Sequence, residues 1–234
     1  MALSISLITL NIFVWLFDIA LGLSPTSPSS QELLVLGANY LPATLREPWR
    51  LMSSMFMHAG IVHLGFNMLT LVQFGPICES FYGRKGMLIV YFFSGILGGM
   101  ASLFFGAAVT VSVGASGAIL GLQGAILCAV ATKGRLLQPG AARKIAMVMG
   151  LIVIMNLALG LATPAIDNAA HLGGLIGGFF AALLLVEKFD HSQYRKHGTT
   201  RVMLATVLSF VALGACWEFI ATLHGGARLA KLFT

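Results

Sequence analysis

The sequence predicts an all-α, polytopic membrane helix bundle, and two observations lead to that prediction. The 234 residues are 58% hydrophobic and only 9% charged, whereas a soluble domain carries about 25% charged residues. The apolar stretches recur at the length of a membrane-crossing helix rather than as short alternating strands, which favours helices over a β-barrel. Helices suit a bilayer because they satisfy their backbone hydrogen bonds internally.

Seven apolar segments are long enough to cross a bilayer. We predict spans at about 5–23, 61–82, 86–106, 115–132, 145–162, 168–187 and 202–223. The first segment lacks both a Lys/Arg-rich start and a small-residue cleavage site before Pro25. We therefore interpret it as a retained span rather than a signal peptide.

The longest connection, residues 24–60, joins the first two spans. It begins with a run rich in Ser and Pro, yet it also contains Trp49 and Phe56. Aromatic side chains favour the membrane–water interface. We therefore predict an amphipathic first loop that lies in the interface rather than a solvated linker.

The distribution of Lys and Arg predicts the orientation. With the N-terminus in the cytoplasm, the cytoplasmic connections carry Arg84, Lys85, Lys133, Arg135, Arg143, Lys144, Lys188, Arg195, Lys196 and Arg201. The opposite side then carries Arg46, Arg50, Arg228 and Lys231. Because cytoplasmic loops are enriched in positive charge, this excess predicts a cytoplasmic N-terminus and an external C-terminus.

Composition argues against several other classes of protein. The net charge of +6 comes from basic residues scattered at span ends, which argues against nucleic-acid binding. Cys78, Cys128 and Cys216 lie within apolar stretches and are typical of small buried hydrophobic residues rather than of disulfides or a metal site. The sequence shows neither metal-ligand spacing nor a Gly-rich phosphate loop, so we expect no cofactor and no metal.

Four polar residues from distant parts of the sequence are predicted to share one depth in the membrane. His63, Ser116 and His171 lie near the start of the second, fourth and sixth spans, which all enter from the external side. Asn67 lies about 6 Å deeper than His63 on the same helix face. One such residue alone is more typical of interhelical hydrogen bonding, but four at one level, beside glycines, favour a functional site.

These residue types fit peptide hydrolysis by an activated serine. That reaction needs a base for the hydroxyl proton, donors for the developing oxyanion and access to the carbonyl carbon. His171 can be the base, while the Ser116 amide, His63 and Asn67 can be the donors. Gly114 and Gly117 allow a substrate backbone to approach closely.

Glycines also predict how Ser116 and His171 could meet. The sixth span contains Gly173, Gly174 and Gly177, a small-residue face that permits close helix packing. Asp167, four residues before His171, can either orient the imidazole or end a loop at the surface. Because the lysines lie at cytoplasmic ends or near the C-terminus, we favour a Ser–His dyad over a Ser–Lys pair.

Five motifs together resemble the rhomboid family of intramembrane serine proteases. They are Glu47-Pro48-Trp49-Arg50, Phe56-Met57-His58, His63-Leu64-Gly65-Phe66-Asn67, Gly114-Ala115-Ser116-Gly117 and Ala170-His171-Leu172-Gly173-Gly174. Their order and spacing over about 47–178 are similar to those of the family's six-span core. Each motif is weak alone, and the combination is specific.

The resemblance implies a role for each matching residue. Ser116 would be the nucleophile and His171 its base, and His63, Asn67 and the Ser116 amide would form the oxyanion hole. Trp49 and Arg50 resemble a Trp-Arg pair of the family's first loop, and Glu79 resembles a structural glutamate near the end of the second span. The chain departs from some family members at Leu120. In those members an aromatic residue at this position stacks on the catalytic histidine.

The resemblance also implies the organisation and activity of the whole chain. We expect a six-span core over 1–201 and an additional membrane helix with a short tail over 202–234. The expected activity is cleavage of single-span or polytopic membrane proteins in the lipid bilayer. The compactness of the chain, rather than the resemblance, predicts a bacterial cell membrane as its location, and a eukaryotic organelle is the alternative. A rhomboid-like protein that binds membrane clients without cleaving them is the alternative. The sequence predicts no oligomeric state.

Overall fold

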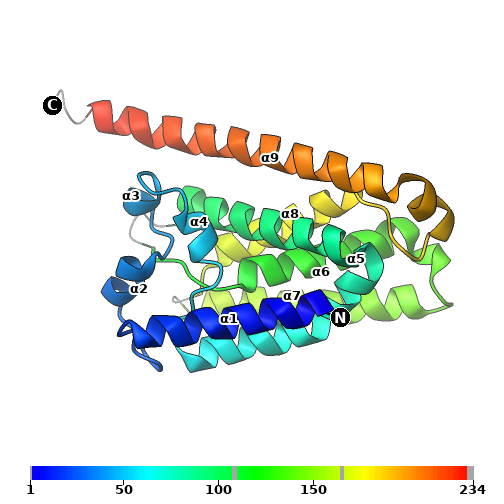
Figure 1. Cartoon of the computed structure of the whole chain (residues 1–234), viewed down its shortest axis with the longest axis horizontal. Helices are drawn as coiled ribbons and strands as arrows, with labels where there is room; N and C mark the ends of the chain where they lie inside the picture. The colour runs from blue at the N-terminus through cyan, green and yellow to red at the C-terminus, as the bar shows by residue number, and fades with distance from the viewer. Residues whose placement is uncertain (1, 107–109, 164–165, 231–234) are drawn as a thin grey trace.

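The protein, seen in a computed structural model, is a bundle of α-helices (Figure 1). Residues 2–106, 110–163 and 166–230 are described. Their helices are α1 (Ala2–Ala20), α2 (Ser30–Leu36), α3 (Leu41–Thr44), α4 (Arg50–Ser53), α5 (Ile61–Phe105), α6 (Ser116–Lys133), η1 (Gly134–Leu136), α7 (Ala141–Ala162), α8 (Asn168–Leu183) and α9 (His191–Ala230). The predicted all-α membrane bundle is confirmed, since α1, α5, α6, α7 and α9 are long and apolar enough to cross a bilayer.

Helix α5 contains two of the predicted spans. Its helical backbone is interrupted at Gly83, where φ is 71° and ψ is 175°, and the chain reverses direction there (Figure 1). A positive φ strains any residue with a Cβ atom, so glycine suits this turn between the spans predicted at 61–82 and 86–106. The number of membrane crossings itself stays a prediction.

Several helix bounds differ from the predicted spans. Helix α8 ends at Leu183, ahead of the predicted 187, and α9 begins at His191, ahead of the predicted 202. The apolar pattern marks only the part of a helix that lies within the membrane. The polar residues from His191 to Thr200 continue the same helix beyond that part. The proposed boundary between core and additional helix at 201/202 therefore falls inside α9.

Helix α6 lies at the centre of the bundle and positions the site. Most of its side chains are buried, including Leu122, Ala125 and Ile126. Helix α7 has few buried residues by contrast. Among its described residues, only Met149, Val153 and Gly160 are buried. The core is therefore built around α6 with α5 and α8 against it, while α7 lies at the periphery.

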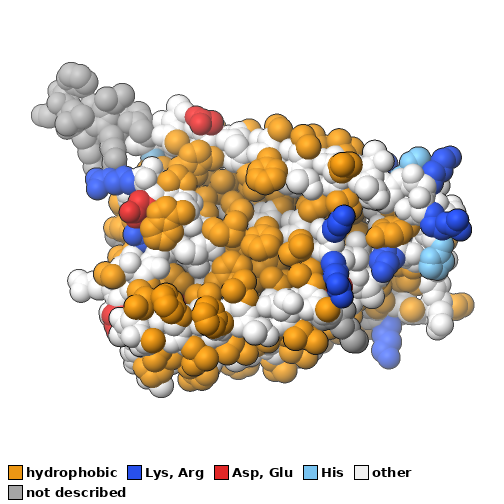
Figure 2. Space-filling view, viewed as in Figure 1, with side chains coloured by type: hydrophobic (Ala, Val, Ile, Leu, Met, Phe, Trp, Pro, Cys, Tyr) orange, Lys and Arg blue, Asp and Glu red, His pale blue; other side chains and the backbone are white. Residues whose placement is uncertain are grey.

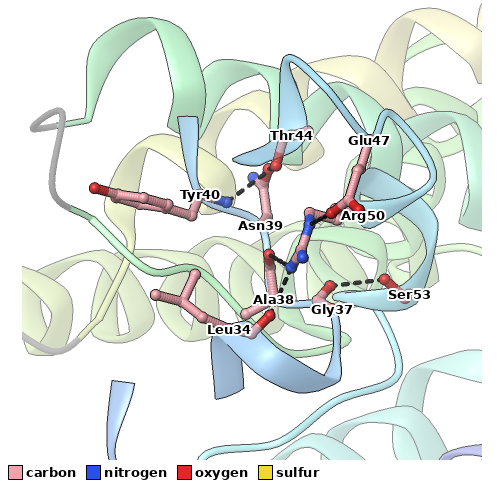
Figure 3. Close-up of polar contacts among 9 residues, drawn as sticks. All are labelled: Leu34, Gly37, Ala38, Asn39, Tyr40, Thr44, Glu47, Arg50 and Ser53. Carbon is pink, nitrogen blue, oxygen red and sulfur yellow. Dashed lines mark hydrogen bonds and ion pairs between the residues drawn. The ribbon is translucent and has the colours of Figure 1, made fainter. Parts of the chain in front are cut away.

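The first loop is ordered around Arg50 (Figure 3). The Arg50 guanidinium donates to Glu47 Oε2 at 2.6 Å and to the Leu34 carbonyl at 2.7 Å, and it lies 5.0 Å from the Trp49 ring centroid. Trp49 also packs on Gly37, the left-handed residue that ends α2. These contacts fit the structural role proposed for Trp49 and Arg50, and the exposed Trp49 ring fits the proposed interfacial position of the loop.

Glu79 connects α5 to the start of α1. Its carboxylate accepts hydrogen bonds from the Ser4 hydroxyl at 2.8 Å, the Ser4 amide at 3.1 Å and the Leu3 amide at 3.3 Å. Arg84 lies 3.6 Å from the same carboxylate. A carboxylate here satisfies amides that have no acceptor within α1 and interacts favourably with the helix dipole, which fits the structural role proposed for Glu79.

The basic residues on the face shown in Figure 2 gather mainly at the end of the bundle where α9 begins. The Lys133 Nζ and Asp190 Oδ2 atoms pair there at 3.2 Å. This hydrogen bond is the main reason that the pKa of Asp190 is lowered. Of the charges counted on the opposite side, Lys231 lies outside the described residues. The cytoplasmic N-terminus and external C-terminus remain proposals based on this distribution.

Candidate active site

Glycines bring α6 and α8 into backbone contact. A Cβ atom added to Gly174 would lie 2.1 Å from the Gly117 carbonyl oxygen, and one added to Gly178 would lie 2.0 Å from the Gly121 carbonyl oxygen. From the other side, a Cβ on Gly124 would lie 2.1 Å from the Leu175 carbonyl oxygen. No residue with a side chain fits at these positions without a shift of the backbone, so glycine sets the distance between the helices.

The other glycines of α8 face a second helix. A Cβ on Gly173 would lie 2.5 Å from Ala101 Cβ, and one on Gly177 would lie 2.8 Å from Leu97 Cδ2, both on α5. Helix α8 thus uses adjacent glycine stripes to pack closely against α5 and α6 at the same time. These glycines are among those predicted from the sequence to pack closely, whereas Gly98 of α5, where a Cβ would lie 2.6 Å from the Ala170 carbonyl oxygen, is not.

This packing places Ser116 and His171 in direct contact. The His171 Nε2 atom and the Ser116 Oγ atom are 2.8 Å apart, although 55 residues separate them in the sequence. Ser116 is the first residue of α6 and His171 lies in the first turn of α8. Both side chains therefore sit at the same end of the bundle, and the His171 side chain is buried.

His63 and Asn67 lie beside Gly114, two residues before Ser116. Gly114 has a φ of 122°, and a Cβ atom added there would lie 2.8 Å from His63 Nε2 and 3.7 Å from Asn67 Nδ2. Gly114 is thus required both for its backbone conformation and for the space next to His63. The structure brings together Gly114, Ser116, His171, His63 and Asn67 from α5, α6, α8 and the segment before α6.

Neighbouring atoms orient the two candidate oxyanion donors. The Ala59 amide donates to His63 Nδ1 at 3.2 Å, so the proton of a neutral His63 is on Nε2, the nitrogen that faces Gly114. The Asn67 amide donates one hydrogen to the His63 carbonyl at 3.1 Å and keeps a second hydrogen for another acceptor. The contact of Ala59 with His63 could not be predicted from the sequence, because the backbone amide of Ala59 makes the hydrogen bond and its side chain does not.

His58 supports this arrangement from the first loop. Its ring lies edge-on to the His63 ring with centroids 5.2 Å apart, and its Nδ1 atom is 3.1 Å from the Phe56 carbonyl oxygen. Burial, followed by the neighbouring His63, lowers the pKa of His58 to about 3. His58 is therefore neutral at physiological pH, and its Nδ1–H donates to Phe56.

Asp167 caps α8 rather than bonding to the His171 ring. Its Oδ1 atom accepts from the Ala170 amide at 2.9 Å, as is common for an Asp that precedes a helix. Within the described residues the His171 Nδ1 atom has no hydrogen-bond partner. Leu120 is buried in the core, so apolar packing surrounds the position at which the resemblance to the family raised the question of an aromatic residue.

Backbone hydrogen bonds that were not predicted from the sequence connect the segment before Ser116 to the first loop. Asn39 and Ser112 form an isolated antiparallel bridge, with backbone hydrogen bonds of 3.1 and 2.8 Å. The Gly114 amide also donates to the Ser54 carbonyl at 2.9 Å. A single bridge leaves no alternating pattern of residues, so no sequence signal marks it.

Comparison with known proteins identifies the family. A model of the Rhomboid domain matches residues 45–188. The chain is 41% identical over 161 residues to the rhomboid protease GluP of Bacillus subtilis, covering 68% of this chain and 30% of GluP. It is 38% identical to RHOMBOID-like protein 6, mitochondrial, of Arabidopsis thaliana, covering 68% of this chain and 51% of that protein.

A shorter relative matches most of its own length. The putative rhomboid protease YdcA of Bacillus subtilis is 36% identical over 142 residues, which cover 61% of this chain and 69% of YdcA. By contrast, the chain spans from about a third to a half of GluP and RHOMBOID-like protein 6. The matched segment contains Ser116, His171, His63 and Asn67, and the chain belongs to the rhomboid family.

Proposed function

We propose that this protein is an intramembrane serine endopeptidase that hydrolyses peptide bonds in or near the transmembrane segments of other membrane proteins. The single observation that carries the proposal is the 2.8 Å separation between His171 Nε2 and Ser116 Oγ at one end of a membrane helix bundle. Support also comes from the relatives, because GluP and YdcA are both named as proteases.

The proposed reaction begins with proton transfer within the dyad. His171 Nε2 accepts the Ser116 hydroxyl proton while Oγ forms a bond to the substrate carbonyl carbon. The carbon–nitrogen bond then breaks, and His171 returns the proton to the leaving amine. Water attacks the resulting acyl-enzyme by the same base catalysis, releases the new carboxyl end and restores the Ser116 hydroxyl.

Donors beside Gly114 would stabilise the oxyanion in this reaction. As the first residue of α6, Ser116 has an amide with no acceptor inside its own helix, and the helix dipole favours negative charge there. His63 Nε2–H and the second amide hydrogen of Asn67 approach the same turn. Loss of one such donor costs about 100- to 1,000-fold in kcat in serine proteases.

The substrate must present an extended segment to the serine. A helical carbonyl is hydrogen-bonded and shielded, so a transmembrane substrate has to unwind locally before attack. We therefore expect cleavage where Gly, Pro or other weak helix formers lie near the membrane surface at the Ser116 end. With the proposed orientation in a bacterial cell membrane, that surface is the external one.

Cleavage of a single-span model substrate by the full chain in proteoliposomes tests the proposal. Ser116→Ala and His171→Ala should each abolish cleavage and leave the thermal unfolding midpoint within a few degrees of the parent. Ser80→Ala on α5 is the matched control, because this serine is exposed and its hydroxyl donates to the Ile77 carbonyl of its own helix, and it should cleave normally.

A labelled fluorophosphonate distinguishes the proposal from client binding without cleavage. A protease should react at Ser116 and lose that reaction in Ser116→Ala and in His171→Ala. A protein that binds the substrate yet neither cleaves it nor reacts with the probe would be the non-catalytic alternative. Cleavage that persists in Ser116→Ala would rule out the proposed nucleophile.

A further inference from the structure

We infer that α9 is a positioning element for the active site: it holds the first loop, and the first loop holds the turn that carries Ser116. The inference rests on the proposed function, because it assigns α9 a part in that reaction. Three sets of contacts form a continuous path from α9 to Gly114. Of the residues that make these contacts, only Gly114 belongs to the proposed catalytic site.

The first contact is an apolar cluster between α9, the first loop and α5. Its buried members are Leu51, Met100, Leu103 and Ile220, and its partly buried members are Leu41, Leu45, Ile96, Leu213, Cys216 and Trp217. In Figure 1 the C-terminal half of α9 passes over the region of α3 and α4. We call this group the α9 cluster.

The residues that α9 contributes lie on one helix face. Leu213, Trp217 and Ile220 follow the spacing of four and three residues that places side chains together on a helix. Phe210 and Val211, by contrast, are 74% and 63% exposed and face away from the protein. Helix α9 therefore has a protein-facing side toward the loop and a lipid-facing side elsewhere.

The second contact fixes the loop to α5 next to the α9 cluster. The Asn39 side chain donates from Nδ2 to the Gly99 carbonyl at 3.0 Å, and the Thr44 hydroxyl donates to Asn39 Oδ1 at 2.9 Å (Figure 3). A Cβ atom on Gly99 would lie 3.0 Å from Leu51 Cδ2. The buried Leu51 therefore belongs to the α9 cluster and also touches the backbone to which Asn39 is bonded.

The third contact connects the loop to the catalytic turn. Asn39 pairs with Ser112 through two backbone hydrogen bonds, and the Ser54 carbonyl accepts from the Gly114 amide. Ser112 and Gly114 lie four and two residues before Ser116. A shift of the first loop would therefore move the turn that carries the proposed oxyanion site, and α9 packs on the loop residues Leu41, Leu45 and Leu51 through the α9 cluster.

The test uses the full chain in proteoliposomes with the model substrate. Ile220→Ala and Trp217→Ala should lower kcat by about 10-fold and change KM by less than about twofold, because misplacement of reacting groups lowers the rate rather than substrate binding. Trp217→Phe should restore most of kcat. The matched control is Phe210→Ala, a large-to-small change on the lipid-facing side of α9, and it should leave kcat unchanged.

A double-mutant cycle adds a readout that simple loss of stability does not produce. If α9 acts through the loop, Leu45→Ala and Ile220→Ala should affect kcat non-additively. Each variant is assayed well below its own unfolding midpoint. If Trp217→Ala or Ile220→Ala does not fold, Ile220→Val replaces it with a smaller expected decrease of kcat.

The possible outcomes separate this inference from the proposed function. An active parent whose α9-cluster variants keep their kcat, or whose effects are additive, would overturn the inference and leave the protease proposal standing. A parent that neither cleaves nor reacts with a fluorophosphonate would instead overturn the proposed function. If Phe210→Ala lowered kcat as much as the α9-cluster variants do, the inference would also be overturned. The decrease would then follow from any change in α9 and not from its contact with the first loop.

Discussion

The α6–α8 and α1–α5 interfaces hold helices together by different physical means. Between α6 and α8 the backbones themselves are in contact, with glycine where any side chain would collide. Between α1 and α5 the helices are joined by polar side chains, with Glu79 bonded to the first turn of α1 and Asn11 donating to the Tyr91 hydroxyl at 3.4 Å.

The difference follows from what each interface has to position. A reacting pair tolerates little displacement, and rigid backbone contact leaves few ways for Ser116 and His171 to separate. Long side chains can adjust by changes in rotamer, so Glu79 can hold α1 in the bundle without setting a distance to a fraction of an ångström. We expect mutations at the first interface to affect catalysis, and mutations at the second to affect stability.

Among the changes that test this comparison of interfaces, the largest effect is expected for Gly174→Ala. The added methyl group would meet the Gly117 carbonyl oxygen at 2.1 Å, and since that atom belongs to the backbone, the helices must move apart. A displacement of about 1 Å can cost about 100-fold in rate, so kcat/KM for the model substrate and the fluorophosphonate reaction rate should both fall by about that factor.

The control for this prediction is Gly214→Ala on α9, where a Cβ atom would meet nothing within 4 Å. This variant should keep the parent's activity. A Gly174→Ala protein with near-parental activity would mean that the α6–α8 distance does not govern the dyad. The comparison between the two interfaces would then lose its physical basis.

These two interfaces also differ in how far the sequence could predict them. The glycines of the sixth span predicted close packing, because a small-residue face permits helices to approach closely in a membrane. The pairing of Glu79 with the start of α1 could not be predicted from spacing, because 75 residues separate Glu79 from Ser4. The resemblance to rhomboids indicated a structural role for Glu79, and the structure supplied its partner.

The candidate site shows the same division between pattern and tertiary contact. The span positions alone predict the site, because polar residues at a shared membrane depth are unusual. Those residues are Ser116, His171, His63 and Asn67. The bridge from Asn39 to Ser112 and the hydrogen bond from Gly114 to Ser54 involve backbone atoms, which carry no residue-specific signal. Helix bounds were missed where polar residues continued a helix beyond the lipid, as in α9.

An intermediate effect is expected for Glu79→Ala. The substitution leaves amides in the first turn of α1 without their carboxylate, and loss of a helix cap costs about 1–2 kcal/mol. The free energy of unfolding in detergent should fall by about that amount, while kcat of the folded protein stays within about twofold of the parent.

Gln73→Ala is the control for this variant, because Gln73 lies on the same helix and is exposed. It should change neither the unfolding free energy nor kcat. If Glu79→Ala instead lowered kcat as strongly as Gly174→Ala without loss of stability, the α1–α5 interface would also position the dyad. The proposed division of roles would then be wrong.

The smallest effect, and the sharpest test of what glycine does in this protein, is expected for Gly150→Ala. Gly150 lies within α7, and a Cβ atom added there would meet nothing within 4 Å. Alanine is a better helix former than glycine by about 0.5–1 kcal/mol, so the unfolding free energy should rise slightly and cleavage should be unchanged. A loss of activity in Gly150→Ala would indicate that glycine provides flexibility in α7. Unchanged activity, beside a large loss in Gly174→Ala, would assign the role of glycine to close backbone contact alone.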